Sequence, residues 1–359
     1  MGAEMTDMTR RSLLAGAVAG GAAVVSAMGA RGQAVSGSAP QAAPPNRPPR
    51  LRPGDLVALV APASVTYDED TLLIAVESLE ALGLRVTVGT HVMDRYGYLA
   101  GTDQDRAADI NAAFADDDVC GVIALRGGWG ASRALRYIDF DTIAANPKVL
   151  LGYSDITSLL NAVLTKANLV GFHGPNGLSP WTTFTTREMR RIIFDGEMPV
   201  MRNPQLRDGT LAVRANRTYP VVSGRAQGRL VGGNLTLLAA LAGTPYFPDT
   251  TDAIVFVEEV NEYIYRCDRM LTQLALAGVF EKAAGVVLGN FTDCDVSPDG
   301  YGRFSLNDVF EQHLVPLGKP AFSGAMIGHI AQKRTIPLGV MAEIDAETGT
   351  IELLEPAVV

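Results

Sequence analysis

The chain has 359 residues, which at about 150 residues per domain predicts two domains. Hydrophobic residues make up 47% and charged residues 19%, a composition that excludes a disordered or collagen-like chain. The formal charge is −9, and its acidic excess lies beyond residue 50, which excludes a nucleic-acid partner because phosphate contacts need clustered lysine and arginine.

The N-terminus has the pattern of a targeting segment. Arg10 and Arg11 precede a stretch rich in alanine and glycine that runs to about Met28, which resembles a twin-arginine export signal. A transmembrane anchor is the alternative, but it needs about 20 strongly apolar residues, and this stretch is shorter and contains glycines. We therefore expect a signal peptide over residues 1–34, a Pro/Ala-rich linker over 35–50, and export to the periplasm.

The next part, residues 51–178, alternates apolar runs with helical patterns. Such alternation predicts βαβ units, and hence an α/β fold with a doubly wound, mostly parallel sheet of the flavodoxin or glutamine-amidotransferase kind. In such sheets the working groups lie just past the carboxyl ends of the strands. The expected strands are 56–61, 85–88, 119–125, 149–153 and 169–172, and the expected helices are 71–82, 103–114, 132–138 and 155–166.

Residues 179–223 are less periodic and are interpreted as a connecting segment. The part after it, residues 224–359, predicts a smaller C-terminal α/β domain with a mixed sheet. Its expected elements are a helix after Asn234, strands at 253–257 and 285–289, a helix at 266–276, and a hairpin of 341–344 with 350–353.

Three turns carry candidate chemistry. Ser154 follows a buried strand and precedes a helix, a position that suits either a presented nucleophile or a helix N-cap. Residues 126–130, Arg-Gly-Gly-Trp-Gly, end another strand and form either a ligand-binding loop or a tight turn. Glu258 and Glu259 end a third strand and are either functional, solvated or N-capping carboxylates.

Histidine is the scarcest base. His91 has no partner pattern, and His313 lies in a polar helix, which indicates a surface residue. His173 precedes Gly-Pro and either belongs to a structural turn or lines a pocket. His329 lies at the end of a segment that contains Gly324 and Gly328. A nucleophilic serine needs a base, and the base needs an orienting carboxylate. Ser154, Glu258 and His329 supply all three, in that order along the chain.

Several motifs together resemble the LD-carboxypeptidase family, the muramoyltetrapeptide carboxypeptidases, from about Leu51 to the C-terminus. They are Pro-Gly-Asp at 53–55, Tyr-Leu-Ala-Gly at 98–101, Arg-Gly-Gly-Trp-Gly at 126–130, Gly-Tyr-Ser-Asp-Ile-Thr at 152–157, His-Gly-Pro at 173–175, Val-Gly-Gly-Asn at 231–234, Phe-Val-Glu-Glu at 256–259, Tyr-Arg-Cys-Asp-Arg-Met-Leu at 265–271 and Gly-His at 328–329.

The resemblance implies a serine peptidase whose nucleophile is Ser154, acid Glu258 and base His329, with backbone N–H groups of Asp155 and Gly128 as the oxyanion hole. It implies no metal and no cofactor. The substrate that the resemblance implies is a peptidoglycan stem tetrapeptide, from which the terminal D-alanine would be released at an L,D bond. The family usually has Glu-Asp at 258–259 and Gly at 261, where this chain has Glu-Glu and Asn.

Further expectations concern binding and assembly. Arg126 and Asn234 are candidates by position for holding the substrate, and family resemblance alone implies a homodimer. Family members that recycle peptidoglycan work in the cytoplasm, whereas this chain carries an export pattern. Since the three cysteines (Cys120, Cys267, Cys294) cannot all pair and no C-x-x-C occurs, we expect neither a disulfide framework nor a zinc site.

Two alternative functions remain. A related enzyme type confers microcin immunity by cleaving an amide in a peptidyl-nucleotide, and Trp181 in the connecting segment could stack on a base. An exported two-lobed α/β protein could also be a solute-binding receptor, which would need no serine triad.

Overall fold

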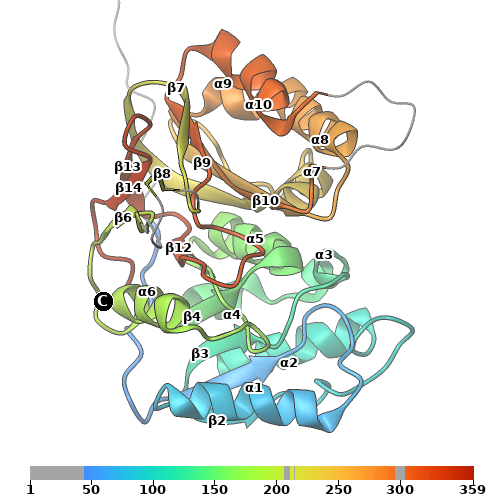
Figure 1. Ribbon diagram of the computed structural model, residues 1–359. Coiled ribbons are helices and arrows are strands. Elements are labelled where there is room, and N and C mark those ends of the chain that lie inside the picture. The colour runs from blue at the N-terminus through green and yellow to red at the C-terminus, as the bar shows by residue number, and fades with distance from the viewer. Residues whose placement is uncertain (1–43, 206–210, 214, 296–303) are drawn as a thin grey trace, which may run out of the picture. The chain divides into compact units, whose positions relative to one another are not determined.

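The strands form two sheets in the computed structural model, which describes residues 44–205, 211–213, 215–295 and 304–359 (Figure 1). The predicted signal peptide and the first part of the predicted linker lie outside these residues. Within the described ranges, no helix is both long and apolar enough to cross a membrane.

The first sheet has the order β12-β5-β4-β3-β1-β2. Strands β1 to β5 are parallel in the order 2-1-3-4-5, the flavodoxin-like doubly wound order, and β12 pairs with β5 antiparallel. The predicted fold class of this part is therefore confirmed. The strands are β1 (Leu56–Val60), β2 (Arg85–Val88), β3 (Val119–Ala124), β4 (Val149–Gly152), β5 (Phe172–His173) and β12 (Ile336–Pro337).

Helices connect these strands. Thr102 and Asp105 form a capping box that begins α2, as the sequence pattern favours. Helix α5 is buried over most of its length because it contacts α7 and β8 as well as its own sheet. The predicted helix 132–138 is a short α3 that tightens into a 3₁₀ turn, and α4 was not predicted. The helices are α1 (Glu69–Ala81), α2 (Asp103–Ala115), α3 (Ala131–Ala134), η1 (Leu135–Tyr137), α4 (Phe140–Ala145) and α5 (Thr157–Ala167).

The second sheet is mixed, as expected, with the order β6-β14-β13-β8-β9-β10-β11-β7. Its central strands β8 to β11 are parallel, and the outer strands pair antiparallel. The strands are β6 (Val200–Arg202), β7 (Tyr219–Val222), β8 (Arg225–Asn234), β9 (Ile254–Val260), β10 (Gly285–Thr292), β11 (Ala321–Ser323), β13 (Met341–Asp345) and β14 (Thr350–Leu353).

Helices α8, α9 and α10 gather on the parallel strands of this sheet (Figure 1). Their apolar side chains, such as Leu271 and Phe310, are buried with Val255 and Val286 of the strands, which gives this part its own core. The helices are α7 (Leu235–Leu241), α8 (Ile264–Leu276), α9 (Val279–Lys282), α10 (Leu306–Leu314) and η3 (Val315–Leu317).

Two segments tie the parts of the chain together. Helix α6 (Thr183–Ile193) lies in the predicted connecting segment, where no helix was expected, and buries Phe184, Met189 and Ile192. The described end of the predicted linker is also fixed to the body, because Asn46 bonds to the Asn168 carbonyl and Arg50 to that of Val359. Residues 44–359 accordingly form one compact unit, in which β12 comes from the C-terminal part but completes the first sheet.

Candidate active site

Ser154 lies at the carboxyl end of β4, on a sharp turn. Its φ is 65°, in the left-handed region that a residue with a side chain rarely adopts, and the turn continues as η2 (Ser154–Ile156) into α5. The half-buried side chain makes no capping hydrogen bond, so Ser154 is not an N-cap. Strain of this kind costs about 1–3 kcal/mol and is concentrated at functional sites.

The glycine loop after β3 lies against this serine. A Cβ placed on Gly127 would lie 2.8 Å from Ser154 Cβ, 3.0 Å from its Oγ and 3.2 Å from the Asp155 nitrogen. The Asp155 carboxylate fixes the same loop by accepting a 2.7 Å hydrogen bond from the Ala131 N–H, and burial raises the pKa of this carboxyl. Only a glycine at position 127 therefore leaves open the space beside Ser154 and the Asp155 amide.

Gly128 is held on the other side of the loop. Its φ is 116°, and the Ser64 hydroxyl accepts a 3.0 Å hydrogen bond from the next amide, that of Trp129. The N–H groups of Gly128 and Asp155 have no acceptor among the described residues. Both expected oxyanion donors are thus free to bind a ligand.

Glu258 and His329 are in direct contact. His329 Nδ1 lies 2.7 Å from Glu258 Oε2; Glu258 is fully buried on β9, and the His329 side chain is 17% exposed. Gly328 permits this approach, because a side chain there would collide with the Glu258 carboxylate. The buried carboxylate therefore orients the imidazole and leaves Nε2 as the ring nitrogen that can exchange a proton with a ligand.

Glu259 has a different role from its neighbour. Its carboxylate accepts hydrogen bonds from Asn234 Nδ2 (2.9 Å), Thr236 N (2.8 Å), Thr236 Oγ1 (2.7 Å) and Val260 N (2.8 Å). Burial raises the pKa of this carboxyl. Successive side chains of a β-strand point to opposite faces of the sheet. Glu258 therefore points toward His329, and Glu259 points to the opposite face, where it fixes the start of α7.

The Tyr153 side chain lies beside the Glu258–His329 pair. The Tyr153 ring lies 4.9 Å from the His329 ring, centroid to centroid, which brings the residue next to Ser154 against the imidazole. Ser154 Oγ and His329 share no hydrogen bond in the described part of the chain. Catalytic hydrogen bonds are often long in enzymes without substrate, so this geometry does not exclude the pair.

His173 was not assigned a role from the sequence. Its Nε2 lies 4.0 Å from Glu258 Oε1, the carboxylate oxygen that His329 does not contact, and burial lowers the pKa of the imidazole to about 4. His173 is therefore a neutral histidine beneath the Glu258 carboxylate.

Lys333 is a site residue that the sequence reasoning missed. It is 2% exposed, and its ammonium lies 3.9 Å from the centre of the Tyr153 ring. Burial lowers the pKa of this amine to about 8. Nothing in the local sequence marked it, because a lysine between Gln332 and Arg334 has the pattern of a solvated surface loop.

The two predicted substrate-binding residues differ in position. Arg126 is half-buried at the start of the glycine loop, and its Nη1 donates to the Val65 carbonyl at 3.1 Å. Asn234 is 3% exposed, and both ends of its amide are used, by Glu259 and by the Leu237 N–H. The Asn234 side chain thus supports α7 and Glu259, and its role in holding a substrate stays a prediction.

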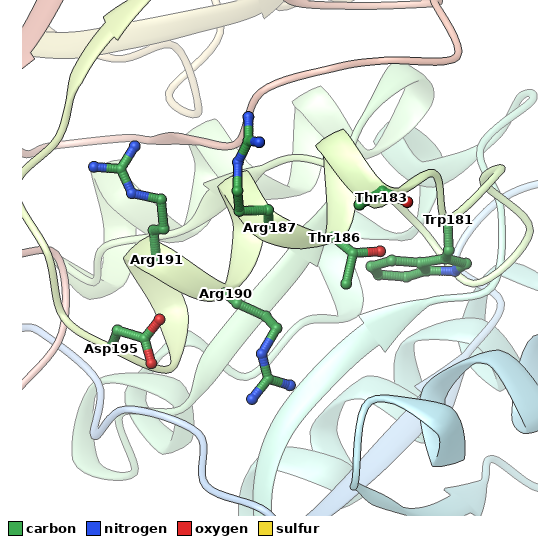
Figure 2. A pocket seen from close by; sticks show the side chains of 7 residues that line it. All are labelled: Trp181, Thr183, Thr186, Arg187, Arg190, Arg191 and Asp195. Carbon is green, nitrogen blue, oxygen red and sulfur yellow. The ribbon is translucent and has the colours of Figure 1, made fainter.

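Trp181 lines a surface hollow of about 480 Å³ along α6 (Figure 2). The arginines of this hollow already have partners: Arg187 bonds to Glu188, Arg190 to the Leu82 carbonyl and Arg191 to Glu197. Ser154, Glu258 and His329 do not line it. The lining residues are Trp181, Thr183, Thr186, Arg187, Arg190, Arg191 and Asp195.

One group of side chains in the described ranges has the spacing of a metal site. Ligand atoms of His91, Asp94 and Asp105 lie within 4.8 Å of one another. His91 already bonds to Asp94, and Asp105 is used in the capping box of α2. These bonds explain the cluster without an ion.

Comparison with known proteins places this site in a family. Residues 57–174 match the LD-carboxypeptidase N-terminal domain, and residues 227–344 match the LD-carboxypeptidase C-terminal domain. A probable murein peptide carboxypeptidase of Bacillus subtilis is 36% identical over 313 residues, covering 85% of this chain and 94% of the relative. The murein tetrapeptide carboxypeptidase of Pseudomonas aeruginosa is 33% identical over 305 residues, covering 80% and 92%.

Solved structures agree with this placement. The microcin C7 self-immunity protein MccF in complex with aspartyl sulfamoyl adenosine superimposes with a TM-score of 0.78 at 25% identity, covering 88% of this chain and all of that one. A muramoyltetrapeptide carboxypeptidase from Oxalobacter formigenes gives 0.69 at 31% identity, covering 83% and 97%. With both domains matched and relatives aligned over most of its length, this chain belongs to the LD-carboxypeptidase family.

Proposed function

We propose that this chain is a serine carboxypeptidase that releases the terminal D-alanine from peptidoglycan stem tetrapeptides by hydrolysing the L,D-peptide bond. The observation that carries the proposal is the 2.7 Å contact of buried Glu258 with His329, beside the strained turn of Ser154. The names of the murein carboxypeptidase relatives support the substrate class.

In the proposed reaction, Ser154 Oγ attacks the carbonyl carbon of the L-configured residue while His329 Nε2 takes the hydroxyl proton. The C–N bond then breaks, and D-alanine leaves with that proton on its amine. Water, deprotonated by His329, hydrolyses the resulting ester and restores Ser154. Glu258 keeps Nδ1 protonated and stabilises the imidazolium at both steps.

The free N–H groups of Gly128 and Asp155 are the proposed oxyanion donors. They would bind the oxygen of the scissile carbonyl as its negative charge develops. Losing one such donor typically raises the barrier by about 3 kcal/mol, a factor of 10²–10³ in rate.

The test is incubation of the purified full chain with L-Ala-D-Glu-diaminopimelate-D-Ala, followed by mass spectrometry. We expect loss of one alanine by the wild type and none by Ser154→Ala. As a control against a contaminating peptidase, the two proteins are purified in parallel. Alanine release at the wild-type rate by Ser154→Ala would overturn the serine mechanism, and an intact tetrapeptide with both proteins would overturn the substrate.

The likeness to MccF favours a second candidate, cleavage of an amide in a peptidyl-nucleotide, with Trp181 as the stacking residue. Incubation with an aminoacyl sulfamoyl adenosine distinguishes the two. The second candidate predicts faster hydrolysis of that compound than of the tetrapeptide, and its loss in Trp181→Ala. Tetrapeptide hydrolysis that is insensitive to Trp181→Ala supports the first.

For the place of action, we propose the periplasm, reached by twin-arginine export. Arg10, Arg11 and the apolar stretch after them support this location. The substrate then comes from the cell wall itself or from fragments released into the same compartment.

A further inference from the structure

Lys333 is a buried cation without a counter-ion. No carboxylate lies within ion-pair distance of its ammonium in the described ranges, and the side chain is 2% exposed. Among the described residues, two interactions stabilise its charge: the face of the Tyr153 ring, 3.9 Å away, and the longer-range attraction of Glu258. A buried charge that lacks a partner is costly, so its presence here needs an explanation.

The loop that carries Lys333 is firmly fixed. The Lys333 N–H donates to Thr185 Oγ1 at 3.1 Å, and this hydroxyl donates to the Ala331 carbonyl at 3.0 Å. The neighbouring Arg334 pairs with buried Glu188, also on α6. Two anchors from one helix, Thr185 and Glu188, thus fix the loop from which the Lys333 side chain extends to Tyr153.

The ammonium also lies beside the proposed catalytic centre. Tyr153 immediately precedes Ser154, and the same ring contacts the imidazole of His329. The Tyr153 ring thus links the positive charge of Lys333 to the imidazole of the proposed centre. The other predicted cation, Arg126, already donates to the Val65 carbonyl and is only half-buried.

We propose that Lys333 binds the terminal carboxylate of the substrate and thereby makes the enzyme a carboxypeptidase. This inference rests on the proposed function, since recognition of a free C-terminal carboxylate is what a carboxypeptidase requires. The substrate supplies the anion that the described residues do not provide, and a charge-assisted hydrogen bond forms in a site with little water.

A competing role is that Lys333 only adjusts the electrostatics of Glu258 and His329. That role would change the turnover of every substrate by the same factor. Carboxylate recognition instead changes the preference between a free acid and a neutral analogue. The two roles are therefore separable by comparing two peptides.

The experiment uses the full chain and two peptides, the stem tetrapeptide and the same peptide with its terminal carboxylate converted to an amide. We expect the wild type to prefer the free acid. Lys333→Met should lower kcat/KM for the free acid by about 100-fold, mainly through KM, and leave the amide within about threefold. Lys166→Met is the matched control, because this exposed lysine in the last turn of α5 also lies over a tyrosine ring, that of Tyr246, and it should keep the wild-type preference.

Folding is checked separately. Lys333→Met replaces an unpaired buried charge by an apolar side chain of similar length, so its unfolding midpoint should rise. Lys333→Arg keeps the charge and should retain part of the preference. A free-acid to amide ratio in Lys333→Met equal to that of the wild type overturns the inference and leaves the proposed function intact. A wild type that cleaves neither peptide overturns both.

Discussion

Glu258 and Glu259 are adjacent, buried and chemically alike, yet their surroundings assign them to different tasks. Glu258 contacts His329, while every polar contact of Glu259 is structural. Replacing each by glutamine therefore gives a matched pair of variants.

For Glu258→Gln we expect kcat to fall by roughly 10³- to 10⁴-fold, because an amide cannot hold the imidazole in its working tautomer. For Glu259→Gln we expect activity per folded molecule within tenfold and a stability loss of about 1–3 kcal/mol, because its NH₂ group would face donors. Steady-state kinetics and urea unfolding of both variants measure this. Equal loss of activity in the two variants would contradict the assignment of Glu258 as the acid of the triad.

A second prediction concerns how His173 makes the stability of the protein depend on pH. Because burial lowers the pKa of this imidazole from 6.5 to about 4, the unfolded chain binds its proton more readily. The stability that neutral His173 contributes to the folded protein is therefore fully present above pH 6.5 and is lost as the pH falls toward 4. This contribution to the free energy of unfolding is on the order of 3 kcal/mol in all.

The measurement is the free energy of unfolding of wild type and His173→Phe between pH 7 and 4. We expect the free energy of unfolding of the variant to fall less steeply than that of the wild type as the pH is lowered. His91→Gln is the control, since a hydrogen bond to Asp94 raises the pKa of the half-buried His91 imidazole, which therefore contributes in the opposite direction. Parallel curves for wild type and His173→Phe would mean that folded and unfolded His173 bind a proton equally readily, which would contradict the prediction.

The turns of the first sheet illustrate how elements position the site. Ser154 follows β4 and the glycine loop follows β3, and these neighbouring parallel strands bring both carboxyl ends to one edge. Gly127 then has no room for a side chain, because its Cβ would contact Ser154.

We predict that Gly127→Ala lowers kcat/KM at least 100-fold while the protein stays folded, since displacing a nucleophile by a fraction of an ångström is enough. Gly318→Ala is a matched control: its φ is 63° and a Cβ there meets open space, so it should cost about 1 kcal/mol of stability and no activity. Circular dichroism and kinetics test both. Normal activity in Gly127→Ala would remove this loop from the site.

Local pattern predicted some elements well and missed others for physical reasons. β1, β3 and β4 are continuous apolar runs, so their burial could be predicted directly. β8 was missed because three glycines and several polar residues weaken its strand pattern; it forms between β9 and β13. α6 was missed because its charged face obscured an apolar one.

The site divides in the same way. Ser154, Glu258 and His329 were brought together by what a serine nucleophile needs and were assigned by motif resemblance, whereas local pattern alone left Ser154 and Glu258 with structural alternatives. Lys333 could not be predicted, since only tertiary contacts with α6 and Tyr153 turn a polar loop residue into a buried cation.

At the scale of the whole molecule, the candidate groups come from both halves of the chain. Glu258 and His329 belong to the part matched by the C-terminal family domain, and Ser154 to the part matched by the N-terminal one. β12 and α6 connect these parts, so the site depends on the complete fold.

Export is the prediction that concerns the whole chain. Replacing Arg10 and Arg11 by lysine should leave the precursor in the cytoplasm, because twin-arginine transport requires the arginine pair. Fractionation and immunoblotting of cells producing either form measure this, with a cytoplasmic marker protein as the control. Unchanged recovery of the lysine variant from the periplasm would contradict the twin-arginine assignment.

The central claim is that Ser154 is the nucleophile of an LD-carboxypeptidase, and a covalent intermediate tests it most directly. Wild-type protein is acid-quenched during turnover of the stem tetrapeptide, digested and mapped by mass spectrometry. The account predicts a tripeptide acyl group on Ser154, and none in Ser154→Ala or His329→Ala. Two results would contradict it. One is turnover by Ser154→Ala at the wild-type rate without any adduct, and the other is an acyl group on another residue.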